Sequence, residues 1–426
     1  MSMKGMLKKL LLILGPGIVF ASMAIGETHL VLQAYAGALY GMALLWLLVL
    51  VHLFYYPIYE YGARYAVATG ETLIDGYWRL RFRKPLFWYF IFFLMITPAL
   101  ILGSLCGLTG SVLSAMFPVF HPSIDFDMYS TLIFLVTVSI IVANKYKVIE
   151  RISKILMLIL MLLTIFAFFL CPPKPTDFFS GLIPSIPPVI GVWVVVVAIL
   201  RVPSDPAASI FISEWAKEKR KEWGEKPAQL KKSLRMSLID MRISFSLSFF
   251  VAAVFMALGA VIFKPKGIVP EDIDIAFKLS ELYTSIFGQW IFYFFLVGAF
   301  AAFWGGYVSV MDGVSRLFKN VIQRLFEPKE VTTNRIGKMY IILAAGAGLL
   351  MTTVLERPVV LLLFAVSMAL IYYPLVIALN TYCVTKMVDK EFRPGPINVT
   401  LAILGFLLSM TGLVLLILVK VLKVLQ

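Results

Sequence analysis

The 426-residue sequence has little charge and very little cysteine. Only 15% of its residues are charged, 61% are hydrophobic, and it contains three cysteines and three histidines. Three cysteines, two of them in or beside apolar stretches, give neither a disulfide framework nor a thiolate metal site. The chain also lacks a His-Glu-x-x-His pattern, a Walker sequence and a Rossmann glycine pattern, so we do not expect an enzyme. This composition is typical of an integral membrane protein.

Basic residues outnumber acidic residues, and the formal net charge is +14. Many basic residues fall within residues 217–235, a run that could suggest nucleic acid or anionic lipid as a partner. A solvated loop on the cytoplasmic side explains this run more simply, and we expect no nucleic-acid partner. The lipid bilayer is the partner that the composition itself implies.

Eleven apolar stretches are long enough, at roughly 20 residues each, to cross a bilayer. They lie at about 10–33, 38–59, 86–117, 129–144, 153–171, 188–212, 240–263, 287–312, 336–354, 358–380 and 396–420. If the basic N-terminus is cytoplasmic and the loops alternate sides, most Lys and Arg residues fall in cytoplasmic loops, as the positive-inside rule requires. The first stretch is too long for a signal peptide and has no cleavage site, so we expect a retained helix. We predict a multi-pass plasma-membrane protein with a cytoplasmic N-terminus and an outside C-terminus.

Two of the stretches carry polar residues and helix breakers near their middle. The first contains Gly15-Pro16-Gly17 and, further on, GETH at residues 26–29, while the sixth contains RVPSDP at residues 201–206. Proline removes a helical hydrogen bond, and a polar segment after glycine favours an interruption. We therefore predict that helices 1 and 6 are broken.

The two predicted breaks are five spans apart. A five-helix unit that is repeated once inserts upside down the second time, and discontinuous helices at matching positions mark the substrate site of such transporters. The sequence predicts an all-α integral membrane protein with a LeuT-like fold. Its first repeat covers residues 1–171, its inverted second repeat covers 172–380, and an eleventh transmembrane helix with the C-terminus covers 381–426. The predicted function is secondary transport by alternating access, with no cofactor.

Several segments, in order along the chain, resemble those of the Nramp divalent-metal transporters. The family's first-helix region is similar to GPGIVFASMAIGETHLVLQAYAGALYGMALLW, and its Ala-Arg-Leu-Gly-x-x-Thr-Gly-x-x-Leu motif is similar to ARYAVATGETL. Its basic link between spans 4 and 5 resembles YKVIERISKIL, and its Met-Glu-Gly resembles Met311-Asp312-Gly313. The resemblance covers nearly the whole chain and implies a carrier of divalent metal cations.

The departures from this family fall on its metal site. The family's Asp-Pro-Gly-Asn falls on residues 26–29, so Gly26 replaces the aspartate ligand and His29 replaces the asparagine ligand. Its Met-Pro-His-Asn falls on residues 202–205, where Val202 replaces the methionine and only Pro203 is kept. The resemblance thus implies a substrate site at these positions that is rebuilt from other side chains.

The side chains that remain can still bind a metal ion. Glu27 and Asp205 offer carboxylate oxygens and His29 offers an imidazole nitrogen, and we predict these three residues as metal ligands. Hard oxygen donors with one imidazole suit Mn, Fe(II), Mg or Zn ions as the transported substrate. Further residues that could contribute to the substrate site are Gly26, Thr28, Arg201, Val202, Ser204 and Tyr372.

Arg201 allows other interpretations of the same residues. It could pair with Asp205 or Glu27, and a carboxylate held by a guanidinium is a poor metal ligand. Because each charge within the membrane costs at least about 2.5 to 3.5 kcal/mol, a compensated cluster of the three side chains could join the broken helices without an ion. Arg201 could also replace a bound cation during the return step. The alternative function is a LeuT-fold carrier of a small organic or anionic solute that binds Arg201.

The proton route of the family is missing from the third stretch. Nramp transporters use acidic residues on this span, whereas residues 85–118 contain no Asp, Glu, His, Lys or Arg. Transport is then either uncoupled, as in magnesium-transporting relatives that also lost these groups, or coupled through Glu27 and His29. The imidazole of His29 could titrate near neutral pH.

Overall fold

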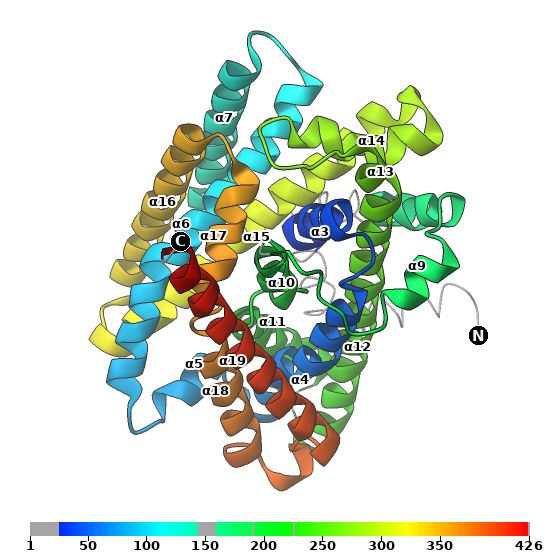
Figure 1. The fold of residues 1–426 in the computed structure, drawn as a ribbon. Helices are drawn as coiled ribbons and strands as arrows, with labels where there is room; N and C mark the ends of the chain where they lie inside the picture. Colours follow the sequence, from blue (N-terminus) through cyan, green and yellow to red (C-terminus); the bar gives the residue numbers. More distant parts are fainter. Residues whose placement is uncertain (1–24, 144–158, 190, 225, 425–426) are drawn as a thin grey trace, which may run out of the picture.

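The computed structural model describes residues 25–143, 159–189, 191–224 and 226–424, which form helices joined by turns and loops. The helices pack side by side in one bundle, with α3 and α10 in its middle (Figure 1). The predicted all-α fold class is therefore confirmed. Gly15-Pro16-Gly17 and the rest of the first helix up to residue 24 lie outside the described residues.

Eight helices of the described chain precede the sixth predicted span. They are η1, a π-helical segment (Ile25–Val31), α3 (Leu32–Tyr40), α4 (Leu45–Thr69), α5 (Leu73–Trp78), α6 (Arg83–Met116), α7 (Pro122–Val142), an apolar helix at Ile159–Leu170, and α9 (Pro175–Ser180).

The second half begins with the two pieces of the sixth predicted span. Its helices are α10 (Val192–Leu200), α11 (Ala208–Trp223), α12 (Pro227–Leu258), η2 (Gly259–Phe263), α13 (Lys264–Lys266), α14 (Ile275–Phe287), η3 (Gln289–Ile291), α15 (Phe292–Phe326), α16 (Glu330–Leu355), α17 (Pro358–Ala369), α18 (Tyr373–Lys386), η4 (Lys390–Phe392) and α19 (Pro396–Val424).

Local sequence explains where several helices begin and end. Helix α4 ends at Gly70, which has a φ of 75°, a conformation that glycine adopts without a steric penalty. Helix α5 begins with a capping box between Thr72 and Asp75, so two backbone N–H groups at its start are satisfied. Helices α7 and α17 each begin at a proline, Pro122 and Pro358, where the missing N–H has no helical partner to lose.

Most predicted spans correspond to helices of the described chain. Six helices in the described ranges are long and apolar enough to cross a membrane, or seven if the bent pair α17 and α18 counts as one span. The second predicted span is α4, which carries the buried residues Glu60 and Arg64. Only part of the fifth is described, as the helix Ile159–Leu170.

The tenth predicted span, residues 358–380, is not one straight helix. Helices α17 and α18 are bent by 52° at a break after Ala369. The sequence offered a signal for this break, because Pro374 lies at the start of α18, where a proline cannot continue a preceding helix. This bend was not predicted from the sequence.

Glycine allows the central helices to cross at short distance. At Gly62 of α4, an added Cβ would lie 2.1 Å from the carbonyl oxygen of Ser209 in α11, and at Gly37 of α3 it would lie 2.1 Å from that of Met256 in α12. Outside this core, large apolar side chains such as Phe92 and Leu343 are more than half exposed. An apolar exterior around a close-packed, partly polar interior is the arrangement that a bilayer requires.

Candidate functional site

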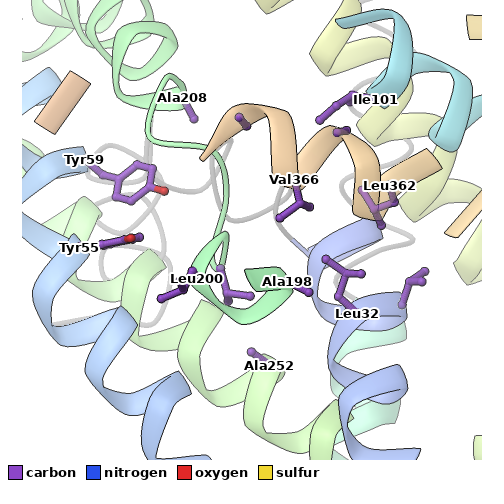
Figure 2. Packing of buried hydrophobic residues seen from close by; sticks show 14 of the residues in the cluster. Leu32, Tyr55, Tyr59, Ile101, Ala198, Leu200, Ala208, Ala252, Leu362 and Val366 are labelled. Atoms are coloured by element: carbon purple, nitrogen blue, oxygen red, sulfur yellow. The ribbon is translucent and has the colours of Figure 1, made fainter. Parts of the chain in front are cut away.

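The sixth predicted span is broken where the sequence predicts it. Helix α10 ends at Leu200, α11 begins at Ala208, and a non-helical connection joins them (Figure 2). The freed carbonyl groups have side-chain donors: the hydroxyl of Tyr59 donates to the carbonyl of Ser204, and Thr28 Oγ1 donates to that of Pro203 at 3.0 Å. Because a buried unpaired carbonyl is costly, these bonds from other helices stabilise the broken conformation.

The described part of the first span begins as a π-helical segment rather than an α-helix. This segment, η1, carries Glu27, Thr28 and His29 and continues into α3. Gly26 lies against α15, and an added Cβ there would lie 3.0 Å from the carbonyl oxygen of Ala302. A carboxylate side chain at position 26, where the family's aspartate falls, would therefore require the backbone of η1 or α15 to shift.

Glu27 and Arg201 form a buried ion pair between η1 and the break in the sixth span. Arg201 Nη2 donates to Glu27 Oε1 at 2.9 Å, and the two side chains are 3% and 6% exposed. The pair leaves polar atoms over: Glu27 Oε2 and two guanidinium nitrogens of Arg201, Nε and Nη1, are buried and have no hydrogen-bond partner in the structure. The sequence leaves open whether Arg201 pairs with Glu27 or Asp205, and in the structure its ion pair is with Glu27.

Asp205 is held by the connection that carries it and by the tenth span. Its Oδ1 accepts from the backbone N–H of Ala207 at 2.8 Å, and its Oδ2 accepts from the hydroxyl of Tyr372. Tyr372 lies in the bend between α17 and α18. The bend in the tenth span, which was not predicted from the sequence, therefore positions the Tyr372 hydroxyl to donate to Asp205 of the sixth span.

One cavity of about 70 Å³ joins these groups. The carboxylates of Glu27 and Asp205, the guanidinium of Arg201 and the side chains of Ser204 and Tyr372 line it on one side. Its remaining lining residues come from α6, from the connection before α11, and from α11 and α15: Leu94, Thr97, Pro98, Ile101, Ala207, Ala208, Phe211, Val310, Val314 and Leu317. Because a water molecule occupies about 30 Å³ in the liquid, a space of this size suits a few waters or a small ion.

The other residues predicted for the site lie elsewhere. His29 is fully buried, with Nε2 2.8 Å from Ser248 Oγ of α12 and Nδ1 2.9 Å from Thr28 Oγ1. Val202 is also fully buried, and neither it nor His29 lines the cavity. Among the described residues, no three His, Cys, Asp or Glu side chains gather as a metal-binding group. The set of Glu27, His29 and Asp205 as metal ligands stays a prediction.

The walls on α6 and α15 were not foreseen. They are almost entirely apolar, and the sequence gives no signal that Ile101 or Val314 faces a cavity rather than lipid or a neighbouring helix. Tyr59 was also missed, although its position on α4 places its ring beside the broken connection (Figure 2). A tyrosine in an apolar helix is an ordinary packing residue, and only the position of its partner, Ser204, gives it a role.

Known proteins resemble this chain over nearly its whole length. The profile of the Nramp family, described as natural resistance-associated macrophage protein-like, matches residues 17–420. An uncharacterized protein of Pasteurella multocida is 27% identical over 389 residues, which cover 88% of this chain and 85% of that protein. The divalent metal cation transporter MntH of Caldanaerobacter subterraneus is 25% identical over 419 residues, which cover 96% of this chain and 94% of the relative.

Solved structures show the same fold. A manganese transporter of Eremococcus coleocola superposes with a TM-score of 0.71 at 16% identity, over 98% of this chain and 88% of that one. MhsT, solved in complex with L-phenylalanine, superposes with a TM-score of 0.57 at 14% identity, over 95% and 97% of the two chains. The predicted LeuT-like fold and the predicted resemblance are both confirmed. The chain belongs to the Nramp family, a family of multi-pass membrane transporters and not of enzymes.

Proposed function

We propose that this protein is a secondary transporter that carries a divalent metal cation across the plasma membrane by alternating access. One observation carries the proposal. Glu27 gives one carboxylate oxygen to Arg201 and keeps the other, Oε2, buried and without a hydrogen-bond partner, on a cavity that Asp205 also lines. A buried unpaired carboxylate oxygen needs an explanation, and a cation that visits the cavity supplies one.

The charges of the cavity favour a cation as substrate. Two carboxylates and one guanidinium line the cavity, so its lining has a net charge of −1 when all three groups are ionised. An entering ion can bind Glu27 Oε2 and Asp205 while Arg201 stays on Glu27 Oε1, or it can displace Arg201 from Glu27. In either case Arg201 acts as a built-in counter-charge that keeps Glu27 compensated when no ion is bound.

His29 is the third predicted ligand, and in this conformation its imidazole contacts Ser248. To join Glu27 and Asp205, the imidazole has to leave Ser248. The lack of charged residues in 85–118 supports transport without the proton route of the family. The distribution of Lys and Arg over the loops supports a cytoplasmic N-terminus and an outside C-terminus.

Uptake by proteoliposomes tests this function. We expect saturable uptake of one or more of Mn²⁺, Fe²⁺, Mg²⁺ and Zn²⁺, and a loss of at least about tenfold in Glu27→Gln and in Asp205→Asn, because a unit charge about 4 Å from an ion is worth roughly 4 kcal/mol at an effective dielectric of about 20. Asp177→Asn is the matched control, because Asp177 is an exposed acid on α9 that does not line the cavity. Wild-type protein that neither binds nor transports any of these ions would overturn the proposal.

A second candidate function rests on Arg201. Two of its guanidinium nitrogens, Nε and Nη1, are buried without a hydrogen-bond partner, and each can donate a charge-assisted hydrogen bond to an oxygen of an anionic solute. A small organic acid could therefore be the substrate. The cavity of about 70 Å³ is small for such a solute, since pockets for drug-sized ligands measure about 300 to 1,000 Å³. Thermal stabilisation by an organic acid in the wild type, lost in Arg201→Gln, would favour this candidate.

A further inference from the structure

A second cavity lies far along the chain from the substrate site, on the N-terminal half of α12. It measures about 360 Å³, and three basic residues of α12, Lys231, Arg235 and Arg242, line it together with Glu391 and Phe392 from η4. Lys231 and Arg235 belong to the basic run at residues 217–235, which was expected to be a solvated loop; the structure places them on α12, and Arg242 follows beyond that run. A concave pocket with several cations and an aromatic wall is a more specific feature than a charged loop.

The level of this cavity relative to the membrane follows from helix length. The helix from Ala228 to Lys266 has 39 residues, which is about 58 Å at roughly 1.5 Å per residue. The hydrocarbon core of a bilayer is only about 30 Å thick. Residues 243–263 contain no charged side chain, and these roughly 20 residues span about that thickness. Arg242 therefore lies at the boundary of the hydrocarbon, and Arg235 lies about two turns, or roughly 10 Å, further out.

The basic residues of α12 and its lipid-facing residues lie on adjacent parts of its exposed surface. Lys231, Arg235 and Arg242 are spaced by four and seven residues, which places them on the same side of the helix. Past Arg242 the exposed surface of α12 continues with apolar residues about 80 to 100° around the helix, Ile243 at 42% and Phe250 at 38% exposed. A pocket for a polar, charged group thus continues directly into a surface for hydrocarbon.

The charges of the pocket favour an anion. Glu391 accepts an ion pair from Lys231 at 2.9 Å, which leaves the two arginines as the excess positive charge of the lining residues. The nearby acid of α4, Glu60, acts on Arg242 electrostatically but is itself bound by Arg64 Nε at 2.8 Å. Two guanidinium groups about two turns apart suit the non-ester oxygens of a phosphate group.

We propose that this cavity binds the headgroup of an anionic phospholipid. The phosphate group lies between Arg235 and Arg242, Phe392 and Leu238 of the lining contact the glycerol region, and the acyl chains run along Ile243 and Phe250. The lipid then joins α12, whose later residues contact η1 through Ser248 and His29, to the loop before α19. This site is independent of the transported substrate.

Lipid titration of the purified protein tests this site. In a neutral detergent, phosphatidylglycerol is expected to raise the melting temperature saturably, because a ligand that binds only the folded state stabilises it. Phosphatidylcholine and inorganic phosphate at the same concentrations should not. Arg235→Gln and Arg242→Gln should each raise the apparent Kd for phosphatidylglycerol about fivefold, and the double variant about thirtyfold, as expected for basic residues near an anionic lipid surface.

Lys232→Gln is the matched control, since Lys232 is an exposed base on the same helix that does not line the cavity. It should bind phosphatidylglycerol like the wild type. If the double variant fails to fold, Arg235→Gln alone decides, because Arg235 is exposed and its loss leaves the core unchanged. An unchanged Kd in Arg235→Gln, an equal loss in Lys232→Gln, or a shift that inorganic phosphate reproduces without lipid would each overturn the assignment.

Discussion

Arg201 donates from Nη2 to Glu27 Oε1 at 2.9 Å, and this bond joins the break in the sixth span to the π-helical segment of the first. Neither side chain is compensated by solvent, because Glu27 is 5% and Arg201 is 2% exposed. The attraction between two buried charges offsets a desolvation cost of several kcal/mol for each. The two residues must therefore be understood as one unit, and removing either changes the state of the other.

The first prediction concerns this unit. Arg201→Gln should destabilise the protein by about 3 to 5 kcal/mol, because it leaves Glu27 buried and uncompensated. The double variant Glu27→Gln with Arg201→Gln should recover much of this loss, since neither position then carries a charge. Thermal unfolding of both single variants and the double variant forms the cycle that measures the coupling.

Lys219→Gln serves as the control for this cycle. Lys219 pairs with Glu222 at the exposed end of α11, where an ion pair is worth at most about 1 kcal/mol. Its melting temperature should stay close to that of the wild type. Additive single effects at Glu27 and Arg201 would contradict the interpretation of the two as a pair.

The second prediction separates two roles of His29. If the contact between His29 Nε2 and Ser248 Oγ only holds η1 against α12, Ser248→Ala should lower stability by about 1 kcal/mol and leave metal affinity unchanged. If His29 is a metal ligand that must leave Ser248, the same variant should raise metal affinity, because the competing bond is gone. We expect the first outcome for the conformation described here. Calorimetric titration with Mn²⁺, alongside thermal unfolding, measures both quantities.

The third prediction concerns the crossing of α4 and α11. Gly62→Ala would bring a Cβ to 2.1 Å from the carbonyl oxygen of Ser209, so one helix has to move. Overpacking of this kind costs about 1 to 3 kcal/mol or more, and here it also displaces the start of α11 next to Asp205. Both the melting temperature and uptake should fall.

Gly346→Ala is the matched control for this crossing. Gly346 lies inside α16, and its nearest neighbour, a carbon of Phe134, is 3.8 Å from an added Cβ. The substitution should therefore be neutral or stabilise the helix by about 0.5 to 1 kcal/mol. Equal losses in the two variants would show that the short helix crossing is not the cause.

The break in the sixth span could be predicted because proline and ionisable residues are conspicuous in an apolar stretch, whereas the described part of the first span runs as continuous helix from η1 into α3. The sequence predicts that Arg201 lies near Glu27 or Asp205 but not which of the two it pairs with. The choice depends on a difference of a few ångströms between two carboxylates, and residue spacing does not determine such a difference. His29 looked like a ligand for the same reason as Glu27. Its contact with Ser248 depends on the rotation of η1, and a π-helical segment changes the side on which each residue lies.

The walls of the cavity could not be predicted, because a purely apolar helix such as α6 has no polar side to mark its orientation. The bend in the tenth span had a signal in Pro374. It was overlooked because the flanking residues are apolar and the stretch as a whole reads as one span. Composition and order along the chain therefore predict the fold well, whereas the contacts of the site depend on helix rotation.

The last prediction concerns Glu214, which lies beyond the sixth predicted span, near the middle of α11. Burial is the main cause that raises the pKa of Glu214 from its ordinary value of 4.5 to about 7, and Asp75 and Glu218 add to it, while Lys217 and Arg316 oppose it. The Glu214 carboxyl also accepts a hydrogen bond from Asn320 of α15. Burial outweighs the opposing effects, so the protonated form of Glu214 is favoured in the folded state relative to the unfolded chain.

The sign of the resulting pH dependence follows directly. Below pH 4.5 Glu214 is protonated in both states, and between pH 4.5 and about 7 only the folded state retains the proton. The contribution of Glu214 to the free energy of unfolding therefore falls as the pH rises from 4.5 to about 7 and does not change further above pH 7. Burial raises the pKa of Asp75, but its hydrogen bonds with Thr72 and Arg324 together lower that pKa below its ordinary value, so Asp75 contributes only at lower pH.

Thermal unfolding in detergent between pH 5 and 7.5 measures this contribution. The wild type should lose melting temperature as the pH rises, and Glu214→Gln, which cannot ionise, should show a flatter profile and a higher melting temperature than the wild type at pH 7.5. Glu222→Gln, at a more exposed acid on the same helix, should keep the wild-type slope. A Glu214→Gln profile parallel to that of the wild type would mean that another group carries the pH dependence, and that the contact between α11 and α15 does not depend on the protonation of Glu214.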